Sequence, residues 1–356
     1  MKKSAMVLAG CMMAAALGAK PVYVNDTATA KPRMEVVFLK QPQSDNKSDA
    51  ALLVTYAPEG VEVFLVDGGM PNCTALKALL DLRRSLLIEM GKQDEEKNPD
   101  YKLRFTSLVT HCHPDHIGEL VSNVLRNPFF ELEDLYLPEA TALPTGGNYL
   151  DSHNSDVNER IALLRQIRQF QKRADIHTVP FATREEISCE GGRIELYGPV
   201  TDWGRGEALQ YLIGTYYAQA SPEKRKNDVP TAVINSNCVW YRFVFQGKSI
   251  LFTGDVMKKA RRNDEPFDRM LDFYGPQSLR SDIVKYPHHG ILRNPAAPRL
   301  VEDLLHDPER SFVIVTAMTA WRESVPALEP YHVQVRDASK KDVRFSISDS
   351  ELIELP

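Results

Sequence analysis

Cysteine, tryptophan and an excess of basic charge are what this sequence lacks. Its 356 residues include five cysteines and three tryptophans, and 43 lysines and arginines stand against 48 aspartates and glutamates, a formal net charge of −5. So few cysteines exclude a small disulfide-stapled scaffold. The acidic balance disfavours a protein that coats nucleic acid, because such a protein needs Lys and Arg to replace the counterions of phosphate groups.

The composition that is present is typical of a globular protein. Hydrophobic residues make up 43% of the chain and charged residues 26%, which excludes disordered and collagen-like chains. The sequence has no short-period repeat and no low-complexity tract. A chain of this length forms one large or two ordinary domains and buries a core without help from a metal or a disulfide.

The first 19 residues have the pattern of a secretory signal peptide. A basic start precedes an apolar stretch, residues 5–19, that is too short to span a bilayer. Cleavage after Ala19 would leave a polar linker over residues 20–33. An alternative interpretation takes Leu8-Ala9-Gly10-Cys11 as a lipobox with a lipid anchor at Cys11, but the apolar run continues past this cysteine, which favours the first interpretation. Both predict an exported protein, periplasmic or extracellular, with no transmembrane helix in the mature chain.

Residues 34–356 alternate between strand and helix patterns and are expected to form one domain. In its first part, strands are expected at 34–39, 51–56, 61–66 and 103–110, and leucines recur at helical spacing between 76 and 87. An amphipathic helix is expected at 154–173. Its predicted inward positions are Val157, Ile161, Leu164, Ile167 and Phe170.

The second part of the domain repeats this organisation. Further strands are expected at 193–197, 231–245, 249–252, 281–286, 312–316 and 343–348, with a short helix at 298–305. In each part a strand ends in a polar cluster. Two such blocks predict an α/β fold in which two sheets pack face to face and helices cover the outside.

The polar cluster after residue 110 carries the strongest chemical signal. His111, His113, Asp115 and His116 lie within six positions at the end of a strand. In extended chain His-x-His points both imidazoles to one side, because side chains alternate with period two. Imidazole and carboxylate ligands suit zinc, and four of them so close together suit two ions. Crowding these titratable groups without a metal would be costly, so the cluster predicts a metal site.

Four motifs together carry a resemblance to a known family. In chain order they are Asp67-Gly68-Gly69, His111-x-His113-x-Asp115-His116-x-Gly118, Thr253-Gly254-Asp255 and His288-His289-Gly290. Their order and approximate spacing resemble the metallo-β-lactamase superfamily, whose αββα four-layer sandwich agrees with the pattern of elements above. Within it, residues 249–255 and 282–290 look most like the hydrolase domain of the DNA-uptake competence proteins (ComEC type).

The resemblance implies a role for each motif residue. His111 and His113 would bind one metal ion, Asp115 and His116 the second, and Asp255 would bridge both. His289 would complete the second site and His288 would contact an oxyanion or leaving group, although the sequence alone does not separate the adjacent histidines; Asp115 and His288 are thus the candidate catalytic residues. Asp67 would orient a ligand histidine by accepting its outer N–H.

One expected ligand is missing. Glyoxalases and lactonases of this superfamily carry a further histidine between the first motif and the bridging aspartate, where this chain has only His153 and His177, in unsuitable settings. Asn237 stands where that ligand should fall. An amide oxygen binds zinc weakly, so the first site would be looser, or would hold another divalent ion such as manganese.

The implied reaction is hydrolysis by an exported enzyme. Two divalent ions, Zn²⁺ by preference, would bridge a water and lower its pKa towards about 7. Because the competence-protein branch handles phosphate esters, we expect a phosphoester or phosphodiester substrate, although Ile291 replaces the serine usual after His-His-Gly in that branch. The alternatives are a lactone or β-lactam hydrolase, and a non-catalytic binding module that keeps the metals as structural elements.

Overall fold

The computed structural model describes residues 31–40, 47–58, 60–89, 91, 98–139, 155–200, 235–257, 265–290, 297–317, 320 and 324–356. The predicted signal peptide with Cys11, and almost all of the predicted linker, lie outside these residues, as do His153 and Ile291. Among the described residues no helix is long and apolar enough to cross a membrane.

Two mixed sheets form the centre of the molecule. The first has the strand order β15 (Glu351–Leu355), β14 (Val343–Ser348), β1 (Arg33–Phe38), β2 (Ala50–Ala57), β3 (Gly60–Asp67), β4 (Leu103–Leu108), β5 (Phe130–Pro138) and β6 (Asp175–Val179). The second has the order β13 (Gln334–Asp337), β12 (Phe312–Val315), β11 (Ile283–Lys285), β10 (Lys248–Phe252), β9 (Trp240–Phe245), β8 (Gly192–Tyr197) and β7 (Arg184–Cys189).

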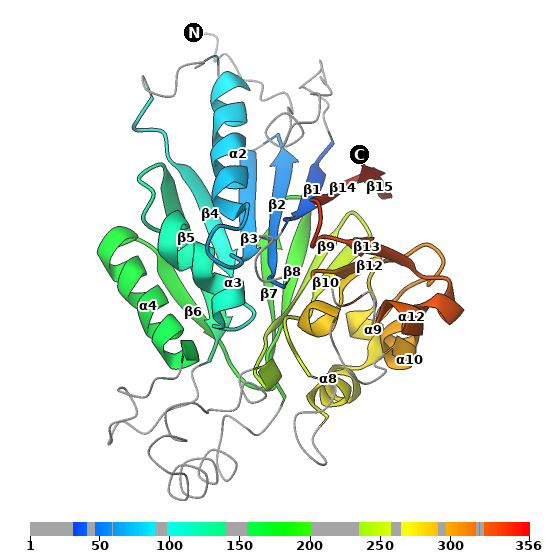
Figure 1. Ribbon diagram of the computed structural model, residues 1–356. Helices are drawn as coiled ribbons and strands as arrows, with labels where there is room; N and C mark the ends of the chain where they lie inside the picture. Colours follow the sequence, from blue (N-terminus) through cyan, green and yellow to red (C-terminus); the bar gives the residue numbers. More distant parts are fainter. Residues whose placement is uncertain are drawn as a thin grey trace, which may run out of the picture.

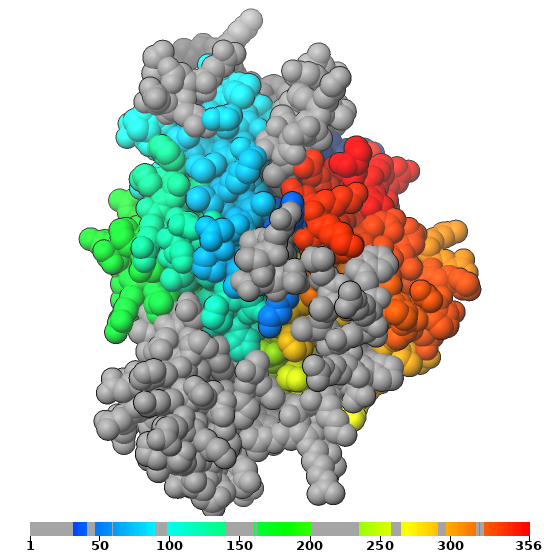
Figure 2. Space-filling view, viewed as in Figure 1, coloured from blue at the N-terminus to red at the C-terminus, as the bar shows by residue number. Residues whose placement is uncertain are grey.

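Helices cover the outer face of each sheet (Figure 1). The first sheet carries α2 (Ala75–Glu89), α3 (Pro114–Glu119), the π-helical turn η1 (Leu120–Val124) and α4 (Ser155–Phe170). The second carries α8 (Pro266–Tyr274), α9 (Pro276–Leu279), α10 (Ala297–Arg299), η6 (Leu300–Leu304) and α12 (Val325–Leu328). In the space-filling view the cyan and green half of the molecule lies beside the orange and red half (Figure 2).

Side chains of a single strand serve two cores, which shows the layering directly. In β2, Leu52 and Val54 pack in the core beneath α2 and α4, whereas Ala51 and Leu53 pack in the core between the sheets. Successive side chains of a strand point to opposite faces, so a strand with both faces buried is apolar throughout. A third core lies between the second sheet and its helices. Three cores separate four layers, and this confirms the predicted αββα sandwich.

The topology brings several strand ends to one edge of the sandwich. Strands β3, β4 and β5 run parallel in the first sheet, and β10, β11 and β12 run parallel in the second. Their carboxyl ends therefore open on the same side within each sheet, which is where ligands bind in parallel sheets. Strand β2 pairs with β3 in antiparallel fashion, with Ala50 opposite Asp67, so the residues that precede β2 also lie at this edge.

Most predicted elements are present, and two details differ. Of the strand expected at 231–245, residues 231–234 lie outside the described residues, 235–236 are helical and the strand itself runs over Trp240–Phe245. In α4 Ile167 is buried as predicted and Leu164 is partly buried, whereas Phe170 is 45% exposed, so the inward position predicted for Phe170 was wrong. Leu163, adjacent to Leu164 and equally apolar, is buried as well, and the side chains of Val157 and Ile161 lie outside the described part of the structure. The cysteines at 73, 112, 189 and 238 are buried and free.

Candidate metal centre

The histidine-rich loop follows β4 and leads directly into α3. Residues 111–113 have no regular structure, and Pro114 occupies the first turn of the helix, where its missing N–H costs nothing. His113 is the N-cap residue, and its carbonyl accepts hydrogen bonds from the backbone N–H groups of His116 and Ile117. His111 Nε2 and His113 Nδ1 lie 2.8 Å apart, and both rings are buried. The loop thus directs two ring nitrogens to one point.

The two ring nitrogens of His116 face different aspartates. Its Nδ1 lies 2.8 Å from Asp67 Oδ2, and Asp67 also accepts bonds of 2.8 Å from the backbone N–H and the hydroxyl of Thr110. Its Nε2 lies 3.2 Å from Asp255 Oδ1. A carboxylate that accepts the outer N–H of a histidine fixes the ring's tautomer and orientation, which is the role that the sequence assigned to Asp67.

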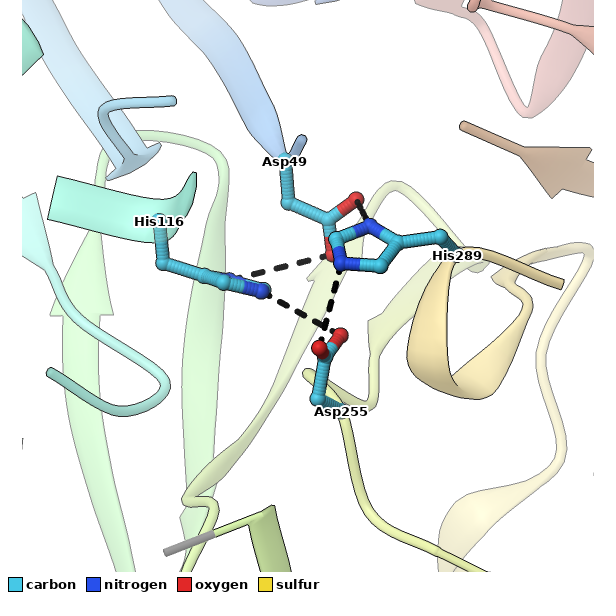
Figure 3. Close-up of side chains that lie close together, drawn as sticks. All are labelled: Asp49, His116, Asp255 and His289. Atoms are coloured by element: carbon cyan, nitrogen blue, oxygen red, sulfur yellow. Dashed lines mark hydrogen bonds and ion pairs between the residues drawn. The ribbon is translucent and has the colours of Figure 1, made fainter. Parts of the chain in front are cut away.

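His289 has the same arrangement, with a different aspartate. Its Nδ1 lies 3.0 Å from Asp49 Oδ1, while its Nε2 lies 3.1 Å from Asp255 Oδ2 and 3.2 Å from Asp115 Oδ2. Figure 3 shows His116 and His289 entering from opposite sides and meeting at Asp255. His116 comes from the first sheet's side, at α3, and His289 and Asp255 follow strands β11 and β10 of the second.

The donor set forms two clusters that share Asp255. Ligand atoms of His111, His113 and Asp255 lie within 4.8 Å of one another, and so do those of Asp49, His116, Asp255 and His289. His116 Nε2 and Asp255 Oδ1 are buried and have no hydrogen-bond partner among the described residues. Buried polar atoms are nearly always hydrogen-bonded in folded proteins. These two atoms meet only as an ion pair at 3.2 Å, a separation into which a divalent cation bound to both would fit.

Charge in the cluster favours cations. Burial would lower the pKa of His289, but Asp255 and Asp49 outweigh this effect and raise the pKa to about 10. Burial acts the same way on His116, and Asp255 and Asp67 likewise raise its pKa well above the ordinary value. Desolvation would raise the pKa of Asp255, but the histidines beside it hold the pKa well below its usual range. Protons on the imidazoles therefore balance the carboxylates when no metal does.

His288 differs from His289 in burial and in its partners. The His288 side chain is 17% exposed and its Nε2 lies 3.8 Å from Asp255 Oδ2, whereas His289 is fully buried. Burial lowers the pKa of His288 to about 4, so this ring is neutral at pH 7. Both residues have left-handed backbone conformations, with φ of 49° and 58°. Such conformations are uncommon for residues other than glycine and concentrate at functional sites.

Two glycines let the motif loops approach closely. A Cβ on Gly118 would overlap Pro71 Cδ, and a Cβ on Gly68 would lie 2.6 Å from Leu120 Cβ. The backbone N–H groups of Gly68 and Gly69 both donate to the carbonyl of His116. The glycines of the first two motifs thus allow the turn after β3 to rest on α3, which keeps Asp67 beside His116.

The structure adds two residues that the motifs did not single out as site residues. Asp49 lies in the segment before β2 and contacts His289, and Lys285, at the end of β11, forms an ion pair with Asp49. Asp49 had a sequence signal, since Ser48-Asp49 directly precedes an apolar strand and β2 pairs with the strand that ends at Asp67.

Asn237, which the sequence places at the position of the missing ligand, lies in a segment beside the histidine loop. Val239 N–H donates to the carbonyl of Thr110, so the segment 235–239 borders the cluster. Asn237 is partly buried there, while Asn235 is fully buried and neither atom of its amide has a hydrogen-bond partner among the described residues.

His177 lies on β6, where it pairs with Asp134 at 2.7 Å and stacks on Tyr136.

Comparison with known proteins gives similarity in structure only. No family model matches the sequence, and no curated protein is similar to it in sequence. Among solved structures, the chain is similar to the metallo-beta-lactamase fold protein YhfI from Bacillus subtilis (11% identity, TM-score 0.42, 88% of this chain and 99% of that one). It is also similar to yeast PDE1, with 14% identity and a TM-score of 0.45 over 87% of this chain and 98% of that one. Zn²⁺-bound PqqB from Methylobacterium extorquens has 11% identity and a TM-score of 0.43 over 88% of this chain and 99% of that one.

Proposed function

We propose that this protein is a metal-dependent hydrolase of the metallo-β-lactamase superfamily with two divalent ions at the centre described above. The observation that carries the proposal is the pair of ligand clusters sharing Asp255. Two adjacent sites with one common carboxylate are the arrangement that two-metal hydrolases need. His116 Nε2 and Asp255 Oδ1 support it, because these buried atoms have no hydrogen bond and a cation between them would satisfy both.

The proposed ligands follow from which atoms converge. His111 Nε2 and His113 Nδ1 would hold the first ion, with Asn237 as a weak additional ligand. The second ion would lie among Asp115, His116 and His289. Asp255 faces both groups and would bridge them. Zn²⁺ suits this nitrogen-rich set, and Mn²⁺ is the alternative where an amide replaces an imidazole.

Metal ions bound here would supply a hydroxide nucleophile at neutral pH and stabilise negative charge that develops on the substrate. The protein's part is to hold the ligands rigidly and to place groups on the exposed side of the centre, which we call the mouth and define by the partly exposed side chains of His288, Asp115 and Lys47. Neutral His288 lies there, where it is positioned to donate a hydrogen bond to an oxyanion or to a leaving-group oxygen. This supports its proposed catalytic role beside Asp115.

A lysine at the mouth favours an anionic substrate. Lys47 is half exposed and its Nζ lies 3.8 Å from Asp115 Oδ2. Burial is the main cause of the lowered pKa of His288, and the charge of Lys47 adds a smaller contribution. An ammonium and a hydrogen-bond donor beside a metal centre would bind the non-bridging oxygens of a phosphate. We therefore propose a phosphoester or phosphodiester substrate, in agreement with the resemblance to the competence-protein branch.

A substrate panel tests this proposal. The purified chain, loaded with Zn²⁺ or Mn²⁺, should hydrolyse bis-(p-nitrophenyl) phosphate and should lose this activity on treatment with a chelator. Turnover of a lactone or a β-lactam without turnover of any phosphoester would refute the phosphoester assignment. Single-stranded DNA belongs in the panel as a further arm, and the acidic chain predicts weak binding to it.

Two variants refine the substrate test. Lys47→Ala should raise KM for the phosphodiester several-fold with little change in kcat, because an exposed charge contributes modest, uniform binding energy. Lys77→Ala is the matched control, since Lys77 forms an exposed ion pair with Asp81 on α2. Equal KM values for the two variants would show that Lys47 does not contact the substrate.

Export is proposed from the N-terminal pattern alone. A cell that expresses the full chain should release or anchor a mature form outside the cytoplasm. The mass of its N-terminal peptide separates the two interpretations, because cleavage after Ala19 leaves an unmodified terminus and a lipoprotein starts at an acylated Cys11. A full-length product in the cytoplasm would refute both.

A further inference from the structure

Asp49 and Lys285 form a buried ion pair beneath the proposed second metal site. The exposed fraction of the Asp49 side chain is 8% and that of Lys285 is 3%. Lys285 Nζ contacts Asp49 Oδ2 and donates a hydrogen bond to the carbonyl of Gly254 at 3.2 Å. Its distance to Asp255 Oδ1 is 3.6 Å. One ammonium thus lies between Asp49 and the carboxylate that both metal clusters share.

The contacts of Asp49 decide between two roles for it. Asp49 belongs to the second ligand cluster by distance, so it could bind the metal itself. Yet its Oδ1 already accepts bonds from Thr316 Oγ1, at 2.5 Å, and from His289 Nδ1, at 3.0 Å. Its Oδ2 accepts no hydrogen bond among the described residues and is held instead by the buried ion pair with Lys285. Oδ1 is thus engaged by two hydrogen bonds, and a metal ion at Oδ2 would have to displace the ammonium of Lys285.

The other ring nitrogen of His289, Nε2, is the one that faces the proposed ligands. It lies 3.2 Å from Asp115 Oδ2 and 3.1 Å from Asp255 Oδ2. A metal ion bound at Nε2 would be shared with these two residues. The contact at Nδ1 then has the same form as the contact between His116 Nδ1 and Asp67.

We propose that Asp49 is the orienting carboxylate of His289 and that Lys285 is its built-in counterion, which allows the acidic centre to fold without metal. Asp49 keeps the proton of His289 on Nδ1 and leaves Nε2 for the ion. Lys285 offsets the charge of Asp49 and part of the charge of Asp255. The inference rests on the metal centre of the proposed function but not on its substrate.

Zinc affinity and the cobalt spectrum test the role of Asp49. Asp49→Asn and Asp49→Ala should each weaken zinc binding about 10- to 100-fold, the usual effect of losing an orienting partner, measured by competition with a chromophoric chelator. The visible absorption of the cobalt-loaded protein should keep its band positions, because the ligand set is unchanged. Asp115→Asn should shift these bands. A comparable shift in the Asp49 variants would show that Asp49 is a ligand and would overturn the proposal.

Thermal unfolding of the metal-free protein tests Lys285. Lys285→Met leaves a buried carboxylate without its counterion and should lower Tm by about 5 to 15 °C. The double variant Asp49→Asn/Lys285→Met should recover at least half of this loss, because it removes the uncompensated charge. Lys285→Arg, which keeps the charge, should lie nearer the wild type than Lys285→Met. A double variant no more stable than Lys285→Met would overturn the counterion role.

A buried pair elsewhere provides the control. Arg242 on β9 binds Glu195 on β8 at 3.0 Å, and neither is in the metal clusters. Arg242→Met should also lower Tm but should leave zinc affinity unchanged. None of these measurements uses a substrate. Zinc binding without phosphodiester turnover would therefore count against the proposed substrate only, whereas normal turnover with unaltered zinc affinity in Asp49→Asn would count against the inference only.

Discussion

Asp67→Asn is the substitution that tests most cleanly whether the second metal site depends on an oriented histidine. Asp67 has a left-handed backbone, with φ of 54°, a conformation that Asn adopts readily, and the two side chains have nearly the same shape. Only the hydrogen bonding changes. The carboxylate accepts three bonds of 2.8 Å, from the N–H and the hydroxyl of Thr110 and from His116 Nδ1.

An amide cannot replace all three acceptor contacts. If the amide oxygen of residue 67 faces the backbone N–H of Thr110, its NH₂ group faces the N–H of His116. If it is turned over, the NH₂ group faces the N–H of Thr110 instead. One donor loses its acceptor in either orientation, so the variant either misorients His116 or loosens the end of β4. We expect zinc affinity to fall about 10- to 100-fold, which corresponds to about 1.4 to 2.8 kcal/mol of binding free energy.

The assay is competition for zinc against a chromophoric chelator, on protein shown to be folded by thermal unfolding. Asp134→Asn is the matched control, because Asp134 also pairs with a histidine nitrogen, His177 Nε2 at 2.7 Å, but on β5 and β6 outside the metal clusters. It should leave zinc affinity unchanged. Folded Asp67→Asn with wild-type zinc affinity would refute the reasoning, and so would an equal loss in Asp134→Asn.

Three further predictions concern the scaffold and are measured by denaturant or thermal unfolding. Gly118→Ala should lower the free energy of unfolding by about 1 to 3 kcal/mol, because its Cβ would overlap Pro71. A variant as stable as the wild type would show that the segment around Pro71 moves aside at no cost. Leu163→Ala should lower the free energy of unfolding by about 2 to 5 kcal/mol and Phe170→Ala by less than about 0.5 kcal/mol, since of the two only Leu163 is buried. A larger loss for Phe170→Ala than for Leu163→Ala would contradict the buried face of α4. Glu195→Gln should cost about 3 kcal/mol at pH 7.

The Glu195 prediction includes a pH dependence with a definite sign. Burial would raise the pKa of Glu195, but its bond from Tyr197 and the charge of Arg242 outweigh burial and hold the pKa below the ordinary 4.5. The folded state therefore binds its proton less readily than the unfolded state. The stability difference between wild type and variant should be fully present above pH 4.5 and should shrink as the pH falls through the folded pKa. A difference independent of pH down to 3 would contradict this account.

The part of the site that the sequence predicts is the part encoded locally. His111, His113, Asp115 and His116 lie on one loop, so their proximity follows from chain geometry. The preference for His289 over His288 as a ligand gains its support from the structure, in which His289 is fully buried with Nε2 3.1 Å from Asp255 Oδ2, and His288 is partly exposed at 3.8 Å.

Asp49 and Lys285 show why the rest needed tertiary structure. The two residues are separated by 236 positions along the chain, Asp49 just before β2 of the first sheet and Lys285 in β11 of the second, and the sequence motifs assigned a site role to neither. Their meeting depends on how the sheets pack. The fold class, in contrast, follows from apolar periodicity and the order of strands, which survive small errors such as the one at Phe170 in α4.

The candidate metal centre takes its residues from segments that follow strands of both sheets, and this has a mechanical consequence. The distance between Asp255 and the histidines of the first sheet's loop is set by the thickness of the core between the sheets, where Phe38 contacts Phe252 and Phe64 contacts Phe243. A smaller side chain there would let the two halves of the ligand set shift relative to each other. Aromatic residues deep in the interior, far from solvent and without any polar atom, thereby define the spacing at which two ions could share one carboxylate.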